Sequence, residues 1–343
     1  MRLRFGLAIA FALISGMRFA AAGTTNDRHA LALLQAAAEA PRHVSFTGQV
    51  EFLTIGAHGS QASVFRVDHL APGLTRRWYV SPPNLHGDWA VSRGNSIYSV
   101  DVKHRRIVFT PNESFGLHYG WDRNLSLLTR NYEPVVGAPT QIAGRSAYTI
   151  ALVNRYTHAT TMRVWIDAQT DLMLERQIYT SNGSLVAQML FDSVRFTGAI
   201  PVSTFTLPSN YTIAPGPSRG LPSIDPSDIM ARAGFAVRAP HYLPEGFTPI
   251  AADLAQENGV RTLHLLYSDG LRTFSLFENA RGSAVDMSGY RQTPFAIGSV
   301  RGQLVDRGAE MLLAWSQGSL HFALVGDLSR DELERIAASI TAN

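Results

Sequence analysis

The chain contains no cysteine. Disulfide bonds, thiolate metal sites, cysteine nucleophiles and a lipid-modified amino-terminal cysteine are therefore all excluded. Without such cross-links the protein must be held together by an ordinary hydrophobic core, and a length of 343 residues is sufficient for one. The same length favours two domains, because single cores rarely grow beyond ~250 to 300 residues.

Surplus charge is also lacking once the first 22 residues are set aside. Lys103 is the only lysine among 30 basic residues, and three of the arginines (Arg2, Arg4 and Arg18) lie in that first segment. The remaining 27 basic residues balance 27 acidic ones, so the net charge of +3 comes from the amino-terminal segment alone. We therefore predict no nucleic-acid partner.

Motifs of the common enzyme classes are missing as well. The chain has no HExxH, GxSxG, Walker or dinucleotide-binding pattern. Its 11 histidines are scattered, and the spacing of His58, His69 and His86 fits no ligand pattern. Asp167 and Asp171 flank a turn, where aspartate commonly accepts backbone N–H groups, so we interpret them as turn formers. We predict that the protein is not an enzyme and has no catalytic residue, metal or cofactor.

Residues 1–22 have the composition of a cleaved signal peptide. Arginines open the segment, residues 5–14 are apolar, and Ala20, Ala21 and Ala22 form a small-residue cleavage site. The apolar run is shorter than the ~18 residues that a membrane-spanning helix needs. We therefore expect an exported, periplasmic protein.

The most regular pattern in the chain lies between Thr161 and Phe196. Its apolar residues largely alternate, which predicts three strands, and the pattern is interrupted at residues 167–171 and at Asn182-Gly183. An Asn-Gly pair suits a tight hairpin because both residues tolerate positive φ. The stretch therefore predicts an antiparallel meander with one apolar face that must be covered.

The rest of the first 208 residues predicts more strands and two helices. Asn26 or Asp27 can cap a helix that ends before Pro41, and a second helix is expected at residues 121–131. Strands are predicted at residues 44–54, 63–69, 75–80, 88–91, 96–100 and 106–110, with a hairpin at 139–154. No alternation of strands and helices indicates a parallel sheet, so we expect an α+β domain with helices over a curved antiparallel sheet.

Large aromatic residues recur along these strands, and they allow two interpretations. Such residues at alternating positions usually form the core, but an apolar ligand cavity is lined by the same residue types. The candidates for the lining of such a cleft are Phe46, Phe52, Phe65, Trp78, Tyr98 and Trp165.

A Pro, Gly and Ser-rich stretch at residues 209–226 predicts a linker between a domain at 23–208 and a second one at 227–343. The second domain is expected to have a short helix near 229–233 and strands at 260–267, 271–278, 298–305, 310–317 and 319–326. Ser329 and Glu332 form a capping box that should start a final helix docked on this sheet.

A family resemblance emerges from these segments. Phe46-Thr47-Gly48, the stretch RRWYVSPPNLHGDWAVSRGNSIYSVD at 76–101 and the meander sequence VWIDAQTDLMLERQIYTSNGSLV resemble the MucB/RseB family of envelope-stress regulators. In the second domain, APHYLPEGF at 239–247 and LLYSDGLRTFSLFEN at 265–279 are similar to the smaller second domain of the same family.

This resemblance implies a half-open antiparallel β-barrel covered by helices, as in LolA/LolB-type carriers, followed by a smaller α+β domain with an antiparallel sheet and a carboxy-terminal helix. It also implies a non-enzymatic regulator. Such a protein binds the periplasmic part of a membrane-anchored anti-sigma factor and senses lipid, lipopolysaccharide or lipoprotein acyl chains, thereby controlling an extracytoplasmic sigma factor. A lipid or lipoprotein carrier is the alternative, and a homo-oligomer is left open.

Two groups of residues are candidates for partner binding. Arg76 and Arg77 lie beside aromatic residues, where one of them can meet an acidic head group or a partner carboxylate, although plain exposed strand residues are the simpler interpretation. The second group belongs to the predicted hairpin of the second domain and consists of Tyr267, Asp269, Leu271 and Phe274.

Overall fold

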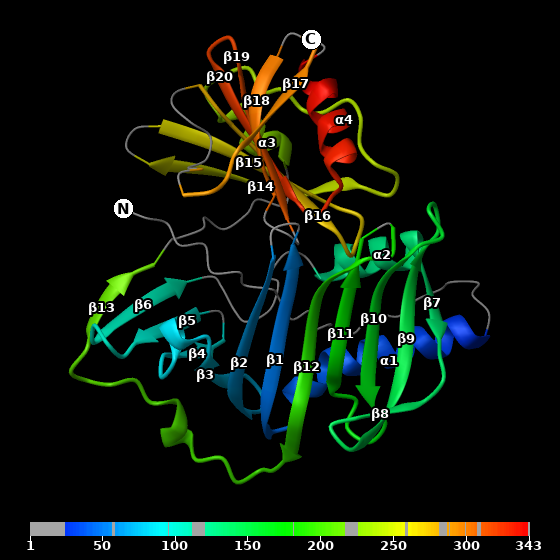
Figure 1. Ribbon diagram of the computed structural model, residues 1–343, viewed down its shortest axis with the longest axis vertical. Helices are drawn as coiled ribbons and strands as arrows, with labels where there is room; N and C mark the ends of the chain where they lie inside the picture. Colours follow the sequence, from blue (N-terminus) through cyan, green and yellow to red (C-terminus); the bar gives the residue numbers. More distant parts are fainter. Residues whose placement is uncertain are drawn as a thin grey trace.

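The computed structural model contains two sheets, one for each predicted domain (Figure 1). It describes residues 25–56, 59–94, 96–111, 121–180, 182–216, 226–257, 260–280, 287, 289–298, 300–306 and 310–341. The predicted signal peptide at residues 1–22 lies outside the described residues. No helix in these ranges is long and apolar enough to cross a membrane.

The first sheet is open. Its strand order is β13-β6-β5-β4-β3-β2-β1-β12-β11-β10-β9-β7, with β8 paired to β9, and all pairings are antiparallel except that of β13 with β6. The strands are β1 (Phe46–Gly56), β2 (Gly59–Leu70), β3 (Leu74–Ser81), β4 (Trp89–Arg93), β5 (Ser96–Asp101), β6 (Arg106–Pro111), β7 (Tyr132–Val136), β8 (Thr140–Ile142), β9 (Arg145–Asn154), β10 (Thr160–Asp167), β11 (Met173–Tyr179), β12 (Leu185–Phe196) and β13 (Thr212–Pro215).

Helix α1 (Thr25–Glu39) covers one face of this sheet and crosses it on the side of β9 to β11 (Figure 1). Its apolar residues Ala30, Leu33, Leu34 and Ala37 recur at helical spacing and are buried against the strands. The 3-10 turn η1 (Ala40–Arg42) follows it, and His69 Nε2 lies 2.6 Å from the carbonyl oxygen of the proline at position 41. The covered face is called the inner face below.

The opposite, outer face of β3 to β6 carries a second apolar layer. The segment after β12, which includes the short turn η3 (Val202–Phe205), returns across this face. Phe205 and Ile200 from that segment pack on Trp89, Val91 and neighbouring side chains of the sheet. Both faces of this half of the sheet are therefore used for packing.

The second sheet has the order β14-β15-β16-β20-β19-β18-β17 and is antiparallel throughout. Its strands are β14 (Thr248–Glu257), β15 (Val260–Ser268), β16 (Thr273–Asn279), β17 (Thr293–Ile297), β18 (Val300–Asp306), β19 (Met311–Gln317) and β20 (Leu320–Gly326). Helix α4 (Arg330–Thr341) packs on one face through Leu333, Ile336, Ala337 and Ile340. The predicted capping box is present, since Glu332 N–H donates to Ser329 Oγ at 3.3 Å and the Ser329 N–H to Glu332 Oε2 at 2.9 Å.

The expected α+β fold class is confirmed, and so are most of the predicted strands. Strands β7, β14 and β17 were missed because their sequences carry proline and little alternation. Part of the predicted linker at 209–226 is a strand. Strand β13 (Thr212–Pro215) pairs in parallel with β6, so this portion belongs to the first sheet. Residues 217–225 of that linker lie outside the described residues. A short helix, α3 (Pro226–Ala231), follows them.

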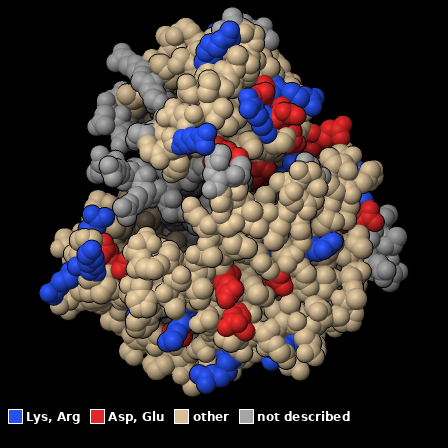
Figure 2. Space-filling model, in the orientation of Figure 1, with Lys and Arg blue, Asp and Glu red and all other residues tan. Residues whose placement is uncertain are grey.

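Helix α2 (Trp121–Asn131) lies at the junction of the two domains (Figure 1). Leu127 from its last turns joins Ile250, Ala251 and Leu266 of the second domain in a small buried cluster. Charged side chains of both signs are interspersed over the face drawn in Figure 2. This distribution agrees with the balanced charge of residues 23–343.

Candidate functional site

The inner face of the central strands is an apolar wall. Because side chains alternate along a strand, Phe46, Val50 and Phe52 of β1 point to the same side, and their partners there include Phe65 of β2 and Phe191 of β12. The ring centroids of Phe46 and Phe191 are 5.6 Å apart. These residues belong to one cluster, and Trp165 is partly buried against it. Trp165 itself lies between the inner-face residues Val164 and Ile166 of β10, so its side chain points to the outer face.

Two arginines interrupt the wall. Arg77 of β3 is paired with buried Val67, and its guanidinium lies 5.1 Å from the centre of the Phe65 ring. Arg176 of β11 is buried and paired with Met189. Burial lowers the pKa of each guanidinium to about 10, so both remain charged at neutral pH. The inner face therefore combines apolar side chains with fixed positive charge.

Trp78 and Tyr98, two further predicted cleft residues, also face away from this wall. Trp78 is paired with Trp89 of the outer layer and is 45% exposed. Tyr98 packs in the same outer layer, 5.0 Å from Phe109. The prediction of one cleft lined by all six aromatic residues is wrong for Trp78, Tyr98 and Trp165, because strand alternation places them on the opposite side of the sheet.

Arg76, the first candidate for partner binding, is part of the outer layer. Its guanidinium lies between two tryptophan rings, 4.7 Å from Trp78 and 4.1 Å from Trp89. Its Nη1 donates to the carbonyl oxygen of Thr204 at 2.9 Å. Arg76 thus attaches the returning segment to the sheet, whereas Arg77 is the arginine that lies on the inner face.

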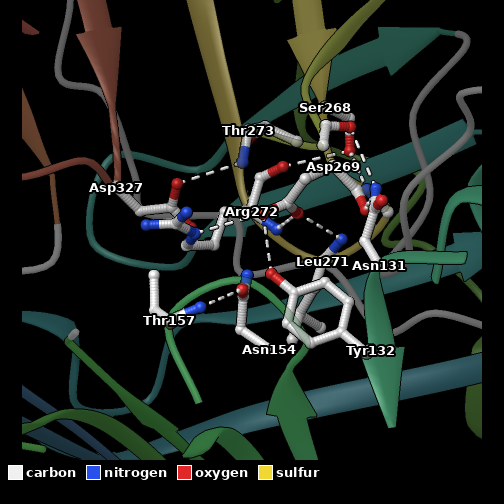
Figure 3. A network of polar contacts seen from close by, with 12 residues as sticks. Asn131, Tyr132, Asn154, Thr157, Ser268, Asp269, Leu271, Arg272, Thr273 and Asp327 are labelled. Atoms are coloured by element: carbon white, nitrogen blue, oxygen red, sulfur yellow. Dashed lines mark hydrogen bonds and ion pairs between the residues drawn. The ribbon is translucent and has the colours of Figure 1, made fainter. Parts of the chain in front are cut away.

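The two domains meet through a buried polar network (Figure 3). At its centre, the hydroxyl of Tyr132 donates to Asp269 Oδ2 at 2.7 Å, and both side chains have no exposed surface. The same carboxylate accepts the N–H groups of Leu271 and Arg272 at Oδ1, at 3.0 and 2.7 Å. It also accepts Arg272 Nε at 3.2 Å, and Arg272 continues to Glu332 at 3.5 Å. Every lone-pair direction of Asp269 is engaged.

Asn131, the last residue of α2, is the second link across the junction. Its Nδ2 donates to the carbonyl oxygens of Gly246 at 2.9 Å and Asp269 at 2.8 Å. Its Oδ1 accepts the hydroxyl of Tyr156 at 3.1 Å. Close approach requires glycine here, because a Cβ at Gly246 would lie 2.8 Å from Asn131 Cγ.

Burial and neighbouring charges determine the protonation states of two groups in this network, Tyr132 and Arg272. Burial, and then the neighbouring Asp269 carboxylate, raise the pKa of Tyr132 far above its usual value, so its hydroxyl stays protonated. Burial alone would lower the pKa of Arg272, but Asp269 and three further acidic groups raise it overall. The Tyr132 hydroxyl and the Arg272 guanidinium therefore keep their protons, and with them their roles as donors, at neutral pH.

The four hairpin residues predicted to bind a partner lie in or next to this joint. Tyr267 and Phe274 stack at 4.6 Å inside the core of the second domain. Asp269 is bound by the first domain, and Leu271 packs into the core of the first domain. In this arrangement the described contacts of the hairpin are with its own chain, and a role in binding another protein stays a prediction.

A Ser-His-Asp row crosses the strands β16, β15 and β14 of the second sheet. His264 Nδ1 lies 2.8 Å from Asp253 Oδ2, and Ser275 Oγ lies 2.9 Å from His264 Nε2. The order of groups matches a hydrolase triad, but Ser275 sits in a central strand whose backbone is paired on both sides. Its own N–H is thus committed to the sheet and unsuited to an oxyanion hole. We interpret the row as a cross-strand structural contact.

The described surface has an open hollow of about 430 Å³ on the outer face, beside the segment that follows β12. Asp68, Thr47 and Arg195 form one cross-strand row along it, and Thr204 lies opposite. Burial raises the pKa of Asp68, an effect that Arg76 partly opposes. None of the predicted cleft residues lines this hollow, so it is separate from the inner wall.

Sequence reasoning missed Asn131, Tyr132 and the two glycines of the joint. Asn131 resembles an ordinary helix end, and Tyr132 continues the apolar stripe of α2. The useful signal was Gly270, in the turn sequence Tyr-Ser-Asp-Gly, since its φ of +100° requires glycine. A turn glycine does not reveal which distant backbone it approaches.

Comparisons with known proteins agree with this architecture. Residues 29–209 match the family described as the MucB/RseB N-terminal domain, and residues 237–340 match one described as a domain of unknown function (DUF4367). No curated protein sequence matches the chain.

Solved structures are similar over both domains. A crystal structure of MucB in complex with MucA(peri) has a TM-score of 0.59 at 18% identity, covering 90% of this chain and 97% of that one. The MucA/MucB complex of Pseudomonas aeruginosa has a TM-score of 0.61 at 17% identity, covering 91% and 98%. MucB alone has a TM-score of 0.53 at 16% identity, covering 91% and 97%. At these identities the structures show a shared fold, and the match over residues 29–209 shows that the chain belongs to the MucB/RseB family.

Proposed function

We propose that this protein is a periplasmic binding protein that holds the extracytoplasmic part of a membrane-anchored anti-sigma factor and releases it when a lipid-like molecule binds to the inner wall. It acts by binding and catalyses no reaction. Through this release it controls an extracytoplasmic sigma factor.

The observation that carries the proposal is the family match together with likeness over the whole length. The match to the MucB/RseB domain covers residues 29–209, and the similarity to MucB crystallised with MucA(peri) extends over 90% of the chain. A lipid carrier needs a cavity but no second domain, whereas this chain buries polar groups to hold a second domain in place. The two-domain arrangement therefore favours a regulator over the alternative of a lipid or lipoprotein carrier.

The inner wall supports the lipid part of the proposal. Burial of an acyl chain contributes about 0.8 kcal/mol per CH₂ group, and the wall supplies Phe46, Phe65 and Phe191 for such contacts. Arg77 and Arg176 add positive charge on the same side of the sheet, which favours an anionic head group. An amphiphile with a negative head thus fits the chemistry of this face better than a neutral one.

The test uses the mature chain, residues 23–343, and the extracytoplasmic segment of a single-span membrane protein that is encoded beside an extracytoplasmic sigma factor in the same genome. Calorimetry should show a 1:1 complex that weakens when laurate, a 12-carbon fatty acid anion, is added. A Phe65→Asp variant, checked for folding by circular dichroism, should keep the complex and lose the response to laurate.

Other outcomes separate the alternatives. Co-purified lipid without any affinity for the membrane-protein segment would favour the carrier. Binding of neither laurate nor the segment would overturn the proposal. Affinity for the segment with no response to laurate would leave a partner-binding protein and refute the lipid sensor.

A further inference from the structure

We propose that the joint between the domains is a latch that opens when the core beneath helix α1 is disturbed, so that binding at the inner wall is transmitted to the second domain. Tyr132 and Leu271 are its moving parts. The inference rests on the proposed function, because it specifies how the same wall communicates with the rest of the molecule.

The first observation is the position of Leu271. This residue belongs to the hairpin of the second domain, yet it packs against the buried cluster under α1. That cluster contains Ala30, Leu33, Leu34 and Ala37 of the helix and Ile150, Leu152 and Val164 of the sheet. A side chain of the second domain therefore completes the core of the first, and any shift of α1 alters the surroundings of Leu271.

The second observation is the double role of Tyr132. Its ring is fully buried in the same cluster, while its hydroxyl donates to Asp269 of the second domain at 2.7 Å. A movement of the ring breaks this hydrogen bond and leaves a buried carboxylate with one donor fewer. Loss of a partner by a buried charged group is costly, so core packing and the joint change together.

The third observation is the closeness of the two backbones. A Cβ at Gly270 would lie 2.3 Å from the backbone nitrogen of Leu128, which shows that the hairpin rests directly on helix α2. Tightly packed contacts of this kind have few intermediate arrangements. We therefore expect the joint to adopt a closed and an open state without stable intermediates.

The inner wall adjoins this core, because Met173 packs against both clusters and Arg176 of the wall is paired with Val164 of the core. An acyl chain that inserts under α1 must take space from side chains of this core, and Leu271 is the member that comes from the other domain. Such a ligand binds better to the open joint than to the closed one. Because coupling is reciprocal, a weaker joint must raise the affinity for the ligand by the same factor.

The experiment measures laurate affinity by calorimetry for the full mature chain and for two joint variants. Tyr132→Phe removes the hydroxyl and keeps the ring. Leu271→Ala removes most of the apolar contact with the core of the first domain and leaves the side chains of the polar network unchanged. Each should bind laurate roughly 5-fold more tightly, the factor that corresponds to the net contribution of one buried hydrogen bond. Should Tyr132→Phe not fold, as judged by circular dichroism, Leu271→Ala still decides the question.

Tyr148→Phe is the matched control. Tyr148 packs against the same cluster but has no described hydrogen bond to the second domain. Removal of its hydroxyl should therefore leave the affinity for laurate unchanged. In the unaltered protein, laurate should also speed hydrogen exchange of the Asn131 side-chain amide, measured by NMR, because this amide donates across the closed joint to Gly246 and Asp269.

Equal or weaker laurate binding by both joint variants would overturn the latch while leaving the lipid site intact. Unchanged exchange of the Asn131 side-chain amide upon laurate binding would do the same. If neither the unaltered protein nor any variant binds laurate, the lipid site of the proposed function is refuted. The latch is then refuted too, because there is no ligand binding for it to transmit.

Discussion

Gly270 of the second domain and Leu128 of the first lie so close that a Cβ on Gly270 would come within 2.3 Å of the Leu128 backbone nitrogen. The φ of Gly270 is +100°, a conformation that side chains rarely adopt. The residue thus meets two independent requirements at the joint. One is local and belongs to the turn, and the other exists only because the domains are in contact.

Substitution of Gly270 by alanine should therefore open the joint. We expect the free energy of unfolding to fall by about 2 kcal/mol or more, because backbone strain and overpacking act together. Thermal unfolding should split into two transitions as the domains lose their coupling. Gly289 is the matched control, because its φ is +90° but a Cβ there meets nothing within 4 Å. Similar effects of Gly270→Ala and Gly289→Ala would contradict the account.

Asn131→Ala should also weaken the joint. The substitution leaves the carbonyl oxygens of Gly246 and Asp269 without the donor that serves both. Each unsatisfied buried group costs about 1 to 3 kcal/mol. We therefore expect the free energy of unfolding, measured by urea denaturation, to fall by about 2 to 4 kcal/mol. Tyr156→Phe removes only a bond from a 44% exposed residue and should cost less than about 1 kcal/mol. A milder effect for Asn131→Ala than for Tyr156→Phe would show that the bridge is unimportant.

The second domain should become less stable as the pH rises from about 4.5 to about 7. Glu278 has no exposed surface, and burial raises its pKa from 4.5 to about 7, although the N–H of Arg238 opposes this. The folded protein then binds the proton more tightly than the unfolded chain does. The stabilisation is complete below the unfolded pKa and is lost as the pH rises through the folded one.

Glu278→Gln should flatten this part of the pH profile and stabilise the protein at pH 8, where the buried carboxylate would otherwise be charged. The check is the unfolding free energy from pH 4 to pH 8 for both proteins. A wild-type curve that rises between pH 5 and pH 7, with a parallel curve for Glu278→Gln, would refute the role of this carboxyl group.

Arg77→Gln should change the choice of ligand at the inner wall. The guanidinium lies on the wall beside Phe65, so its loss should weaken laurate binding about 10-fold, as expected for a charge-assisted hydrogen bond. Binding of dodecanol, which has the same chain length and no charge, should be nearly unaffected. Arg66→Gln is the control, because Arg66 is exposed and lies between two inward-facing residues of β2. Equal losses for laurate and dodecanol would exclude a charge effect.

Local features of this fold could be predicted because they depend on short-range chemistry. Asp167 accepts the N–H groups of Gln169 and Thr170 at 3.1 and 2.9 Å, as expected of a turn-forming aspartate. The same holds for the Ser329 capping box and for the meander at β10 to β12. Residues a few positions apart are always near one another, so their preferences are visible in the sequence.

The candidate site was predicted less well. Alternation along β1 and β2 identified Phe46, Phe52 and Phe65 as one set, but it could not show that Trp78 faces the other way. The reason is register: Trp78 lies opposite Arg66, which alternates with the inward-facing Phe65, so the pairing of β2 with β3 decides the side of Trp78. Such a register depends on both strands at once.

The sequence by itself determined most of the elements and the family resemblance, since alternation, turn residues and caps act over a few positions. Only the tertiary structure decided what the two domains do to each other. Tyr132 and Asp269 are 137 positions apart and meet within 2.7 Å, where neither side chain retains any contact with solvent. Such a pairing costs free energy unless both partners are in place, and only the folded arrangement of both domains brings them there.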